Sequence, residues 1–528
     1  MSNKLILKEL SRYNIGTYAD IIYRNALLYP DKEAFVFGSE RITFAQFNAR
    51  VNSLIHALHS MGVKKGDVLG VLSLNCLEYY DVYGAAEKGG FIISPFNARL
   101  NADALEYLIN YSEANTLFVG PELLEMTDLL KPRLPNIKNF ILLRGTAPNM
   151  KSHHELLASY PKEEPDVQVD EDDPVHIIYT SGTTGLPRGA LYTQRRAMDD
   201  TKTLTIESAL EPSDRFLIIA PAFHVSGIDY PLCHFYVGGT SVILESFDPA
   251  TALQAIQDER ITTIVIVPTH LIAMLNLPDV GKYDISSLKR VCYVGSSMPV
   301  EIIKKALELW GPIFLQDYGL TESGPDTAVL KREEHMVIDR PPEEQEVLYS
   351  CGRPFIGVHV RIVDENVNDV EPGEVGEIII QSKHIMVECW RKPEETQKRL
   401  VNDWLHTGDL GTYDERGYIY IVDRKDDMII SGGENIYPRE VEEVLYKHPA
   451  ILEAAVIGIP DPYWVEKVHA AIVLKQGASL TKDELISFCK KNLASYKTPK
   501  SVEFVDSLPK TSFQKISRTE LRKKYRSA

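Results

Sequence analysis

Residues 175–190 read VHIIYTSGTTGLPRGA, and this stretch indicates the fold class. The apolar residues 175–179 are typical of a buried strand, and the following loop holds glycines, hydroxyls and one cation, Arg188. Glycines let backbone N–H groups approach an anion closely and hydroxyls add donors, so this loop is suited to hold a polyphosphate. It is not a Walker A motif, because no Lys-Ser/Thr pair ends it. The alternative interpretation is a flexible surface turn.

Strands and helices alternate on both sides of this loop. Thr43 and Gln46 form a capping box, and apolar residues recur on one face until Gly62, which predicts a helix over 43–62. Further strands are expected at 68–73, 91–95, 116–120, 216–220, 263–267, 290–294 and 313–316, and further helices at 77–88, 101–114, 251–259 and 299–310. This alternation predicts parallel sheets covered by helices on both faces.

Three other regions differ in composition. Residues 161–173 are acidic and contain proline, so we expect a solvated connector. Residues 358–422 show hairpin-like spacing, which predicts an antiparallel sheet or a small barrel. From 427 onward, helices at 438–448 and 481–493 and strands at 454–458 and 470–474 predict an α+β domain of about 100 residues.

The overall charge excludes some classes of protein. The 528 residues include 57 Lys and Arg against 74 Asp and Glu, a net charge of −17, which argues against a general nucleic-acid binder. With 44% hydrophobic and 25% charged residues, the chain is neither disordered nor collagen-like. Residues 485–528 carry 11 Lys and Arg against three Asp and Glu, so this segment has +8 and the remainder −25.

The cysteines and the N-terminus predict a cytoplasmic protein with reduced thiols. The cysteines are scattered without a CxxC pair or a metal-ligand spacing, so we expect buried thiols. They are Cys76, Cys233, Cys292, Cys351, Cys389 and Cys489. Lys4, Lys8 and Glu9 interrupt the only apolar stretch near the start, which disfavours a signal peptide, and no apolar run is long enough to span a membrane.

Five further motifs carry polar groups suited to chemistry. YGLTES at 318–323 places Thr321 and Glu322 at the end of a strand. A lone carboxylate beside a phosphate loop is suited to bind Mg²⁺. The alternative is that these residues cap a helix. Asp409 lies in WLHTGDL at 404–410, and Arg424 lies in YIVDRKDDMII at 420–430. Both side chains could hydrogen-bond to a ribose. The alternative for each is an ordinary surface ion pair. SGGENIY at 431–437 is a Gly-rich turn. LPKTSFQKISR at 508–518 is basic, and its alternative is a solvated tail.

The order of these motifs resembles the adenylate-forming superfamily, which includes acyl-CoA synthetases, firefly-type luciferases and the adenylation domains of peptide synthetases. The resemblance runs from residue 43 to Arg518. It implies an α/β fold: a large N-terminal domain, residues 1–425, of two doubly wound-like sheets plus a small β-barrel-like subdomain, and a small mobile α+β C-terminal domain, residues 426–528. The hinge would lie at Asp426.

The resemblance also implies roles for individual residues. The catalytic set would be Lys515 for adenylation, Thr321 at the α-phosphate, Glu322 at the metal, and His224. Nucleotide binding would fall to Thr180, Ser181, Gly182, Thr183, Thr184, Arg188, Gly295, Ser296, Ser297, Gln316, Asp317, Tyr318, Gly319, Asp409, Ile421 and Arg424. The acyl pocket would be bordered by Phe223, His224, Val225, Gly227, Gly295, Gly319 and Leu320. Gly432 and Gly433 would line the channel for the pantetheine of coenzyme A.

The implied reaction has two half-reactions. A carboxylate attacks the α-phosphorus of ATP and pyrophosphate leaves, which requires Mg²⁺ and a cation to bring two anions together. A thiol then attacks the acyl-adenylate and AMP leaves. Because one site serves both steps, a rotating domain is expected.

Three positions depart from the family pattern. Arg188 stands where the family usually has Lys, which keeps the charge but replaces a point charge by a planar fork. Gln514, before the adenylation lysine, and Val465, after Trp464, both stand where Gly is common.

Three functions are compatible with these residues. The first is an AMP-forming carboxylic acid–CoA ligase using ATP, Mg²⁺ and coenzyme A, with free CoA as the simplest thiol because no carrier segment is present in the sequence. The others are an adenylating enzyme that loads a carrier protein, and a non-catalytic nucleotide-binding relative, suggested by Gln514. The small residues Gly295 and Ser296 leave room for a fatty, alicyclic or aromatic acid. The oligomeric state stays open, with a homodimer as one arrangement, and we expect no nucleic-acid partner and no transmembrane segment.

Overall fold

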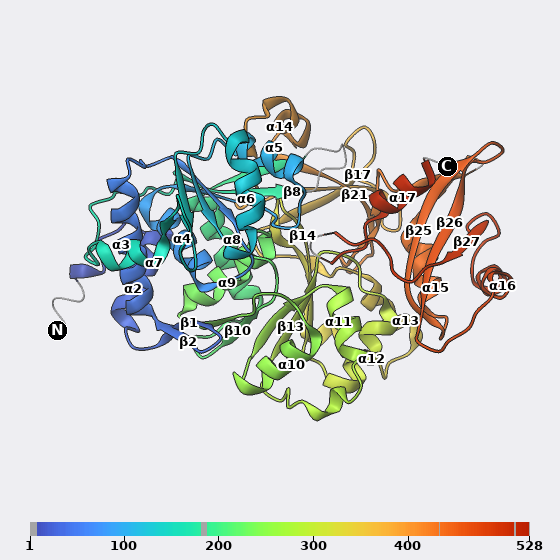
Figure 1. Cartoon of the computed structure of the whole chain (residues 1–528). Coiled ribbons are helices and arrows are strands. Elements are labelled where there is room, and N and C mark those ends of the chain that lie inside the picture. Colours follow the sequence, from blue (N-terminus) through green and yellow to red (C-terminus); the bar gives the residue numbers. More distant parts are fainter. Residues whose placement is uncertain (1–7, 181–186, 432, 512–513, 527–528) are drawn as a thin grey trace.

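The computed structural model describes residues 8–180, 187–431, 433–511 and 514–526, whose strands form four sheets (Figure 1). The three sheets before residue 425 contribute residues to neighbouring hydrophobic cores. The fourth sheet lies to one side of them, in orange and red in Figure 1.

The first sheet contains the strand before the Gly-rich loop. Its central strands are parallel and follow the predicted alternation, with α4 (Leu77–Gly89) and α5 (Ala102–Ser112) as crossovers. Its strands, in spatial order, are β19 (Glu388–Cys389), β9 (Arg188–Thr193), β8 (Pro174–Thr180), β4 (Ile92–Pro95), β3 (Val68–Leu72), β5 (Thr116–Val119), β6 (Asn139–Leu142) and β7 (Lys151–Ser152). Only the β9 side is antiparallel, and β8 pairs with β9 as far as Thr180 and Arg188.

The second sheet is larger and is parallel across its centre. Its strands, in spatial order, are β16 (Arg353–Pro354), β15 (Gly324–Leu330), β14 (Phe314–Leu320), β13 (Arg290–Val294), β12 (Thr263–Ile266), β10 (Arg215–Ile218), β11 (Thr240–Ile243), β1 (Glu33–Phe37) and β2 (Glu40–Thr43). The predicted strand 313–316 is too short: β14 continues to Leu320 and turns into β15, because these residues pair across a hairpin. The alternative that residues 321–323 cap a helix is therefore wrong.

Helices cover both sheets, as the alternation predicted. The predicted capping box begins α3 (Phe44–Ser60), where Thr43 Oγ1 accepts from the Gln46 N–H and the Gln46 side chain accepts from the Thr43 N–H. The other helices before residue 425 are α2 (Tyr18–Leu28), α6 (Leu124–Leu130), α7 (His153–Ser159), α8 (Gln194–Glu207), α9 (Val225–Val237), α10 (Pro249–Asp258), α11 (Pro268–Leu275), α12 (Val300–Trp310), α13 (Pro342–Gln345) and α14 (Pro393–Arg399).

The third sheet confirms the antiparallel prediction for residues 358–422. It contains β17 (His359–Val363), β18 (Gly376–Gln381), β21 (Trp404–Tyr413) and β20 (Leu400–Val401), with β22 (Ile419–Arg424) on β21. Every pairing in it is antiparallel.

The C-terminal region is α+β, as predicted, with its own hydrophobic core. Its strands are β23 (Ile429–Ser431), β24 (Glu434–Ile436), β25 (Ile451–Asp461), β26 (Val465–Leu474) and β27 (Ser501–Phe504), and its helices are α15 (Pro438–Tyr446), α16 (Lys482–Asn492) and α17 (Arg518–Arg526). The basic end is no solvated tail: Lys510 pairs in a β-bridge with Ile516, and Leu521 of α17 is buried.

The prediction of a solvated connector at 161–173 is wrong in part. Glu164 forms an ion pair of 2.6 Å with Lys88, which is fully buried on α4. Glu164 also accepts hydrogen bonds from Tyr13 and Asn48. A buried charge needs a partner, so this acidic residue anchors the connector to the core.

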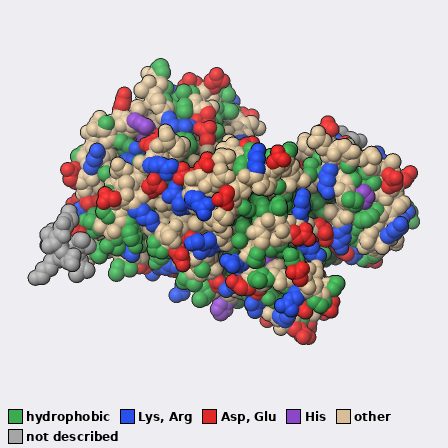
Figure 2. All heavy atoms as spheres, turned by 90° about the horizontal axis from the view of Figure 1, so that it is seen from below, with side chains coloured by type: hydrophobic (Ala, Val, Ile, Leu, Met, Phe, Trp, Pro, Cys, Tyr) green, Lys and Arg blue, Asp and Glu red, His purple; other side chains and the backbone are tan. Residues whose placement is uncertain are grey.

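All six cysteines are free and buried, as expected. Among the described helices, none is both long and apolar enough to cross a membrane. On the face drawn in Figure 2, positive and negative side chains are interspersed.

Candidate functional site

A buried carboxylate between two sheets forms the centre of the site. Asp409 of β21 lies opposite Arg424 of β22 in the strand register, and the Arg424 Nε lies 2.8 Å from Asp409 Oδ1. Tyr318 at the end of β14 donates to Asp409 Oδ2 at 2.8 Å. Burial raises the pKa of Asp409, and Arg424 opposes this rise. The predicted residues are thus brought together, and since Asp409 is buried this is no ordinary surface ion pair.

The lysine loop reaches this centre from the C-terminal region. Thr269 on α11 donates to the Gln514 carbonyl at 2.9 Å, which holds Gln514 against this helix. Burial, then the charge of Arg424, lowers the pKa of the neighbouring Lys515 to about 8. Arg424 and Asp409 both act on Lys515, so the three groups share one electrostatic neighbourhood.

Both departures from glycine adopt the left-handed backbone conformation. Gln514 has φ 60° and Val465 has φ 70°. Glycine adopts such φ values without steric strain, whereas a β-branched residue rarely does. The backbone therefore explains the glycine preference of the family at both positions, and this chain keeps the conformation despite its side chains.

Thr321 and Glu322 lie in the turn between β14 and β15. Tyr192 donates to the Thr321 carbonyl at 2.5 Å, and the Met386 N–H donates to the Glu322 carbonyl at 2.8 Å. The Glu322 carboxylate is buried and pairs with Arg399 at 3.0 Å. One carboxylate suits a Mg²⁺ whose other ligands are phosphate oxygens and water, so Glu322 fits that role once Arg399 is exchanged for the metal.

Some predicted phosphate and pantetheine residues lie outside the described residues, namely Ser181, Gly182, Thr183, Thr184 and Gly432. Thr180 and Arg188 flank the Gly-rich segment in the sequence and are paired between β8 and β9. Arg188 is buried and lies 3.4 Å from Glu395 on α14. Gly433 is exposed in the turn before β24, with φ 87°.

The PAFHVSG segment, 221–227, is held from behind by α4. Tyr83 donates to the Ala222 carbonyl at 2.7 Å and Tyr80 to the Gly227 carbonyl at 3.1 Å. A Cβ on Gly227 would lie 2.1 Å from the Pro221 carbonyl oxygen, so the close approach of the backbone requires glycine there. Burial, then the charge of Lys515, lowers the pKa of His224 to about 3, so this imidazole is neutral at pH 7.

The remaining predicted residues come from several elements, among them β14, α9 and β22. Gly295 and Ser296 are exposed and Ser297 is partly so, whereas Gln316 and Leu320 are buried. The Asp317 carboxylate accepts a hydrogen bond from Tyr230 on α9, so its side chain binds that helix. Phe223 is buried, and Val225, Gly319 and Ile421 are partly exposed. A cavity of about 160 Å³ lies between Phe223, His270 and Gln514.

Sequence reasoning missed several residues that hold the site. Arg399 pairs with Glu322, Thr269 holds the lysine loop, and Tyr192 fixes the turn after β14. None belongs to a motif, and each acts on a residue far away in the sequence. No local pattern could have identified them.

Two family models match the chain. The model described as AMP-binding enzyme covers residues 22–390, and that of the AMP-binding enzyme C-terminal domain covers residues 440–515. The chain belongs to the AMP-binding enzyme family. This confirms the predicted membership of the adenylate-forming superfamily.

Similar proteins extend over nearly the whole chain. A feruloyl-CoA synthase of Amycolatopsis sp is 35% identical over 95% of this chain and 98% of its own. A fatty acid–[acyl-carrier-protein] ligase of Streptomyces coeruleorubidus is 33% identical over 94% of each chain. The crystal structure of an anthranilate CoA ligase in complex with anthranoyl-AMP superposes with a TM-score of 0.89 at 27% identity, covering 96% and 97% of the two chains.

Proposed function

We propose that this chain is an AMP-forming carboxylic acid–CoA ligase that acts on a fatty, alicyclic or aromatic acid through an acyl-adenylate. One observation carries the proposal: Thr269 holds the carbonyl of Gln514, the residue before Lys515, so the C-terminal region reaches the site that contains the Asp409–Arg424 ion pair. A mobile lysine beside a fixed ribose-binding pair is the arrangement that adenylation requires.

In the first half-reaction the substrate carboxylate attacks the α-phosphorus of ATP, and the bond to pyrophosphate breaks. Asp409 and Arg424 would hold the ribose, and the Lys515 ammonium would lie between the carboxylate and the α-phosphate, offsetting the repulsion of two anions. Glu322 would hold Mg²⁺, which neutralises phosphate charge when bound. The hydroxyls and backbone of residues 180–189 would receive the β and γ phosphates.

In the second half-reaction the sulfur of coenzyme A attacks the acyl carbon, and AMP leaves with the electrons of the broken acyl–phosphate bond. Lys515 is not needed at this step, so its domain is free to turn about Asp426. The separate hydrophobic cores on the two sides of that residue support a domain boundary at 425/426.

The surroundings of the acyl position favour an uncharged acyl group. Phe223 and Leu320 are buried, and His224 is neutral because burial lowers its pKa. The names of the relatives, which include a feruloyl-CoA synthase and a fatty acid ligase, support this class of acids.

A screen of pyrophosphate release over fatty acids, cyclohexane carboxylates and benzoates tests the proposal. We expect release with ATP and at least one acid, followed by thioester formation when coenzyme A is added. Absence of acid-dependent release from every class would contradict it and favour a non-catalytic relative.

A second candidate thiol is a carrier protein, because one relative is named as an acyl-carrier-protein ligase. Offering the acyl-adenylate free coenzyme A and a phosphopantetheinylated carrier protein in parallel separates the two. The better acceptor by kcat/KM is the thiol substrate.

A further inference from the structure

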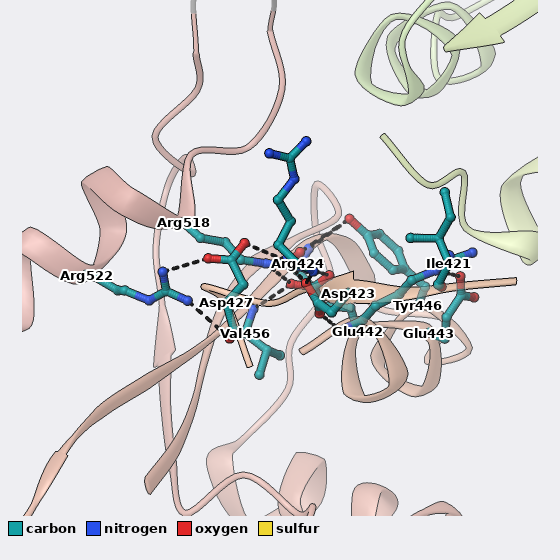
Figure 3. Close-up of polar contacts among 12 residues, drawn as sticks. Ile421, Asp423, Arg424, Asp427, Glu442, Glu443, Tyr446, Val456, Arg518 and Arg522 are labelled. Atoms are coloured by element: carbon teal, nitrogen blue, oxygen red, sulfur yellow. Dashed lines mark hydrogen bonds and ion pairs between the residues drawn. The ribbon is translucent and has the colours of Figure 1, made fainter. Parts of the chain in front are cut away.

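Arg518 joins three carboxylates around the predicted hinge (Figure 3). Its Nη1 donates to Asp423 Oδ1 at 2.9 Å and to Asp427 Oδ2 at 3.2 Å. Its Nε and Nη2 donate to the two carboxylate oxygens of Glu442 at 3.2 and 2.7 Å. A planar guanidinium can serve all three acids at once, which an ammonium on a flexible stem does less well.

The three carboxylates lie on different sides of Asp426. Asp427 and Glu442 follow it in the sequence and would move with Arg518 when the C-terminal region turns. Asp423 precedes it, in β22 of the third sheet. The Asp423–Arg518 ion pair is therefore the contact of this group that a rotation about Asp426 has to break.

Asp423 is an anchor on the N-terminal side of Asp426. Its side chain is buried, and its Oδ1 accepts from the Arg424 N–H at 2.8 Å. Its Oδ2 accepts from the N–H of Arg439 on α15 at 3.0 Å, which is a second contact across Asp426. Arg424 in turn binds Asp409. Arg518 follows Lys515 by three residues, so the anchor fixes the start of α17 beside the ribose-binding pair.

The charges in this group support a tight contact. Burial alone would lower the pKa of Arg518, but Glu442 and Asp423 raise it above its usual value. Burial alone would raise the pKa of Asp427, but Arg518 and Arg522 lower it. Arg518 and Asp427 are thus both charged at neutral pH.

We infer that Arg518 is a positioning residue for adenylation: its ion pair with Asp423 holds Lys515 against the Asp409–Arg424 pair, and its rupture accompanies the change to the thioester-forming arrangement. This inference rests on the proposed function. It assigns to one named contact across the hinge the task of stabilising the first of the two arrangements.

The test compares Arg518→Gln and Arg518→Lys with a matched control, Arg522→Gln. Arg522 binds Asp427 alone, at 2.6 Å to its carboxylate, and so makes no contact with Asp423. Acid-dependent ATP–pyrophosphate exchange should fall roughly 10- to 100-fold in Arg518→Gln, because a displaced lysine loses its reactive geometry, with partial rescue in Arg518→Lys. Thioester formation from supplied acyl-adenylate should stay within about threefold, as should exchange in the control.

A readout independent of activity accompanies these assays. Labelling of Lys515 by an amine-reactive reagent, followed by mass spectrometry, should accelerate in Arg518→Gln and Asp423→Ala but not in Arg522→Gln. Equal losses in both half-reactions, or unchanged labelling, would overturn the inference. If the wild-type protein exchanges pyrophosphate with no acid, the proposed function fails, while labelling still decides whether Arg518 holds Lys515.

Discussion

At the scale of single residues, the proton of Lys515 controls the proposed first step. Burial lowers its pKa to about 8, so this side chain loses its positive charge at a lower pH than an ordinary lysine does. We predict that the rate of acid-dependent exchange declines as the pH rises through about 8.

Lys515→Arg keeps its charge and should remove this decline while retaining part of the rate. Lys515→Ala should lower exchange by about 100-fold or more, because the charge between two anions is lost, and should spare thioester formation from acyl-adenylate. A wild-type profile that stays flat to pH 10 would show that Lys515 does not titrate as described.

Val465 gives a second prediction at this scale. It is β-branched and exposed, and its φ of 70° is strained. Val465→Gly should raise the free energy of unfolding by about 1 kcal/mol, because relief of strain exceeds the added entropy of the unfolded chain. Tyr463→Gly, at an exposed neighbour outside the left-handed region, should lower it by about 0.5–1 kcal/mol in the same denaturant titrations. A lower free energy of unfolding in Val465→Gly than in the wild type would contradict the backbone strain described for Val465.

Whether a site residue could be predicted depends on how far along the sequence its partner lies. Asp409, Arg424 and Lys515 belong to short motifs, so the order of these motifs in the sequence was enough to predict them as site residues. Arg399 and Thr269 carry no local signal, because their partners Glu322 and Gln514 lie 77 and 245 residues away. The left-handed φ of Gln514 could be suspected only because the family prefers glycine there.

At the scale of elements, three buried carboxylates meet where α8, α9 and β15 pack together. They are Asp200, Asp229 and Asp326, and burial raises the pKa of each, to about 8 for Asp229. Between about pH 4 and 8 the folded protein therefore retains a proton on Asp229 that the unfolded chain has lost. Stability contributed by this group falls as the pH rises.

Replacing Asp229 by Asn should remove this pH dependence. We expect the gain in Tm over wild type to be larger at pH 8 than at pH 5. Asp258→Asn, at an exposed position on α10, should show the same small change at both pH values. A gain that does not grow with pH would mean that Asp229 is ionised in the folded protein.

The contact of the acidic connector with α4 gives a further prediction. Glu164→Ala leaves the Lys88 ammonium buried without its carboxylate, and should lower the free energy of unfolding by about 3 kcal/mol. The double variant Lys88→Met/Glu164→Gln should lose less, since no unpaired charge remains. Urea titrations of the variants measure both values, and equal losses would contradict the role of the charge.

The connector also shows why an element can be misassigned from its composition. Its acidic, proline-bearing sequence is typical of solvated loops, yet Glu164 is needed by a buried lysine more than 70 residues earlier. Those helices and central strands that were predicted are confirmed, because their apolar periodicity is local. The β14–β15 hairpin was not, because its pairing depends on residues beyond the predicted strand.

At the scale of the whole molecule, the hydrophobic cores divide near the proposed hinge, Asp426. The largest core extends to Ile419, and the C-terminal core begins at Ile429. A fragment of residues 1–425 should therefore unfold cooperatively by itself, yet show no acid-dependent exchange because it lacks Lys515.

Circular dichroism with thermal melting measures the folding of this fragment, and full-length Lys515→Ala is the matched control for lost activity. A fragment without a cooperative transition would mean that the two regions stabilise each other through their interface. The sequence alone predicted this boundary through the family resemblance, since apolar periodicity does not reveal which cores are continuous.

The six buried cysteines make this protein convenient for site-directed spectroscopy. Burial raises the pKa of every one of their thiols, so the folded protein should react slowly with maleimides. A pair of cysteines introduced on exposed residues, one on each side of Asp426, could then carry donor and acceptor dyes without removal of the native thiols. Energy transfer between the dyes would test whether the C-terminal region turns between the two proposed half-reactions.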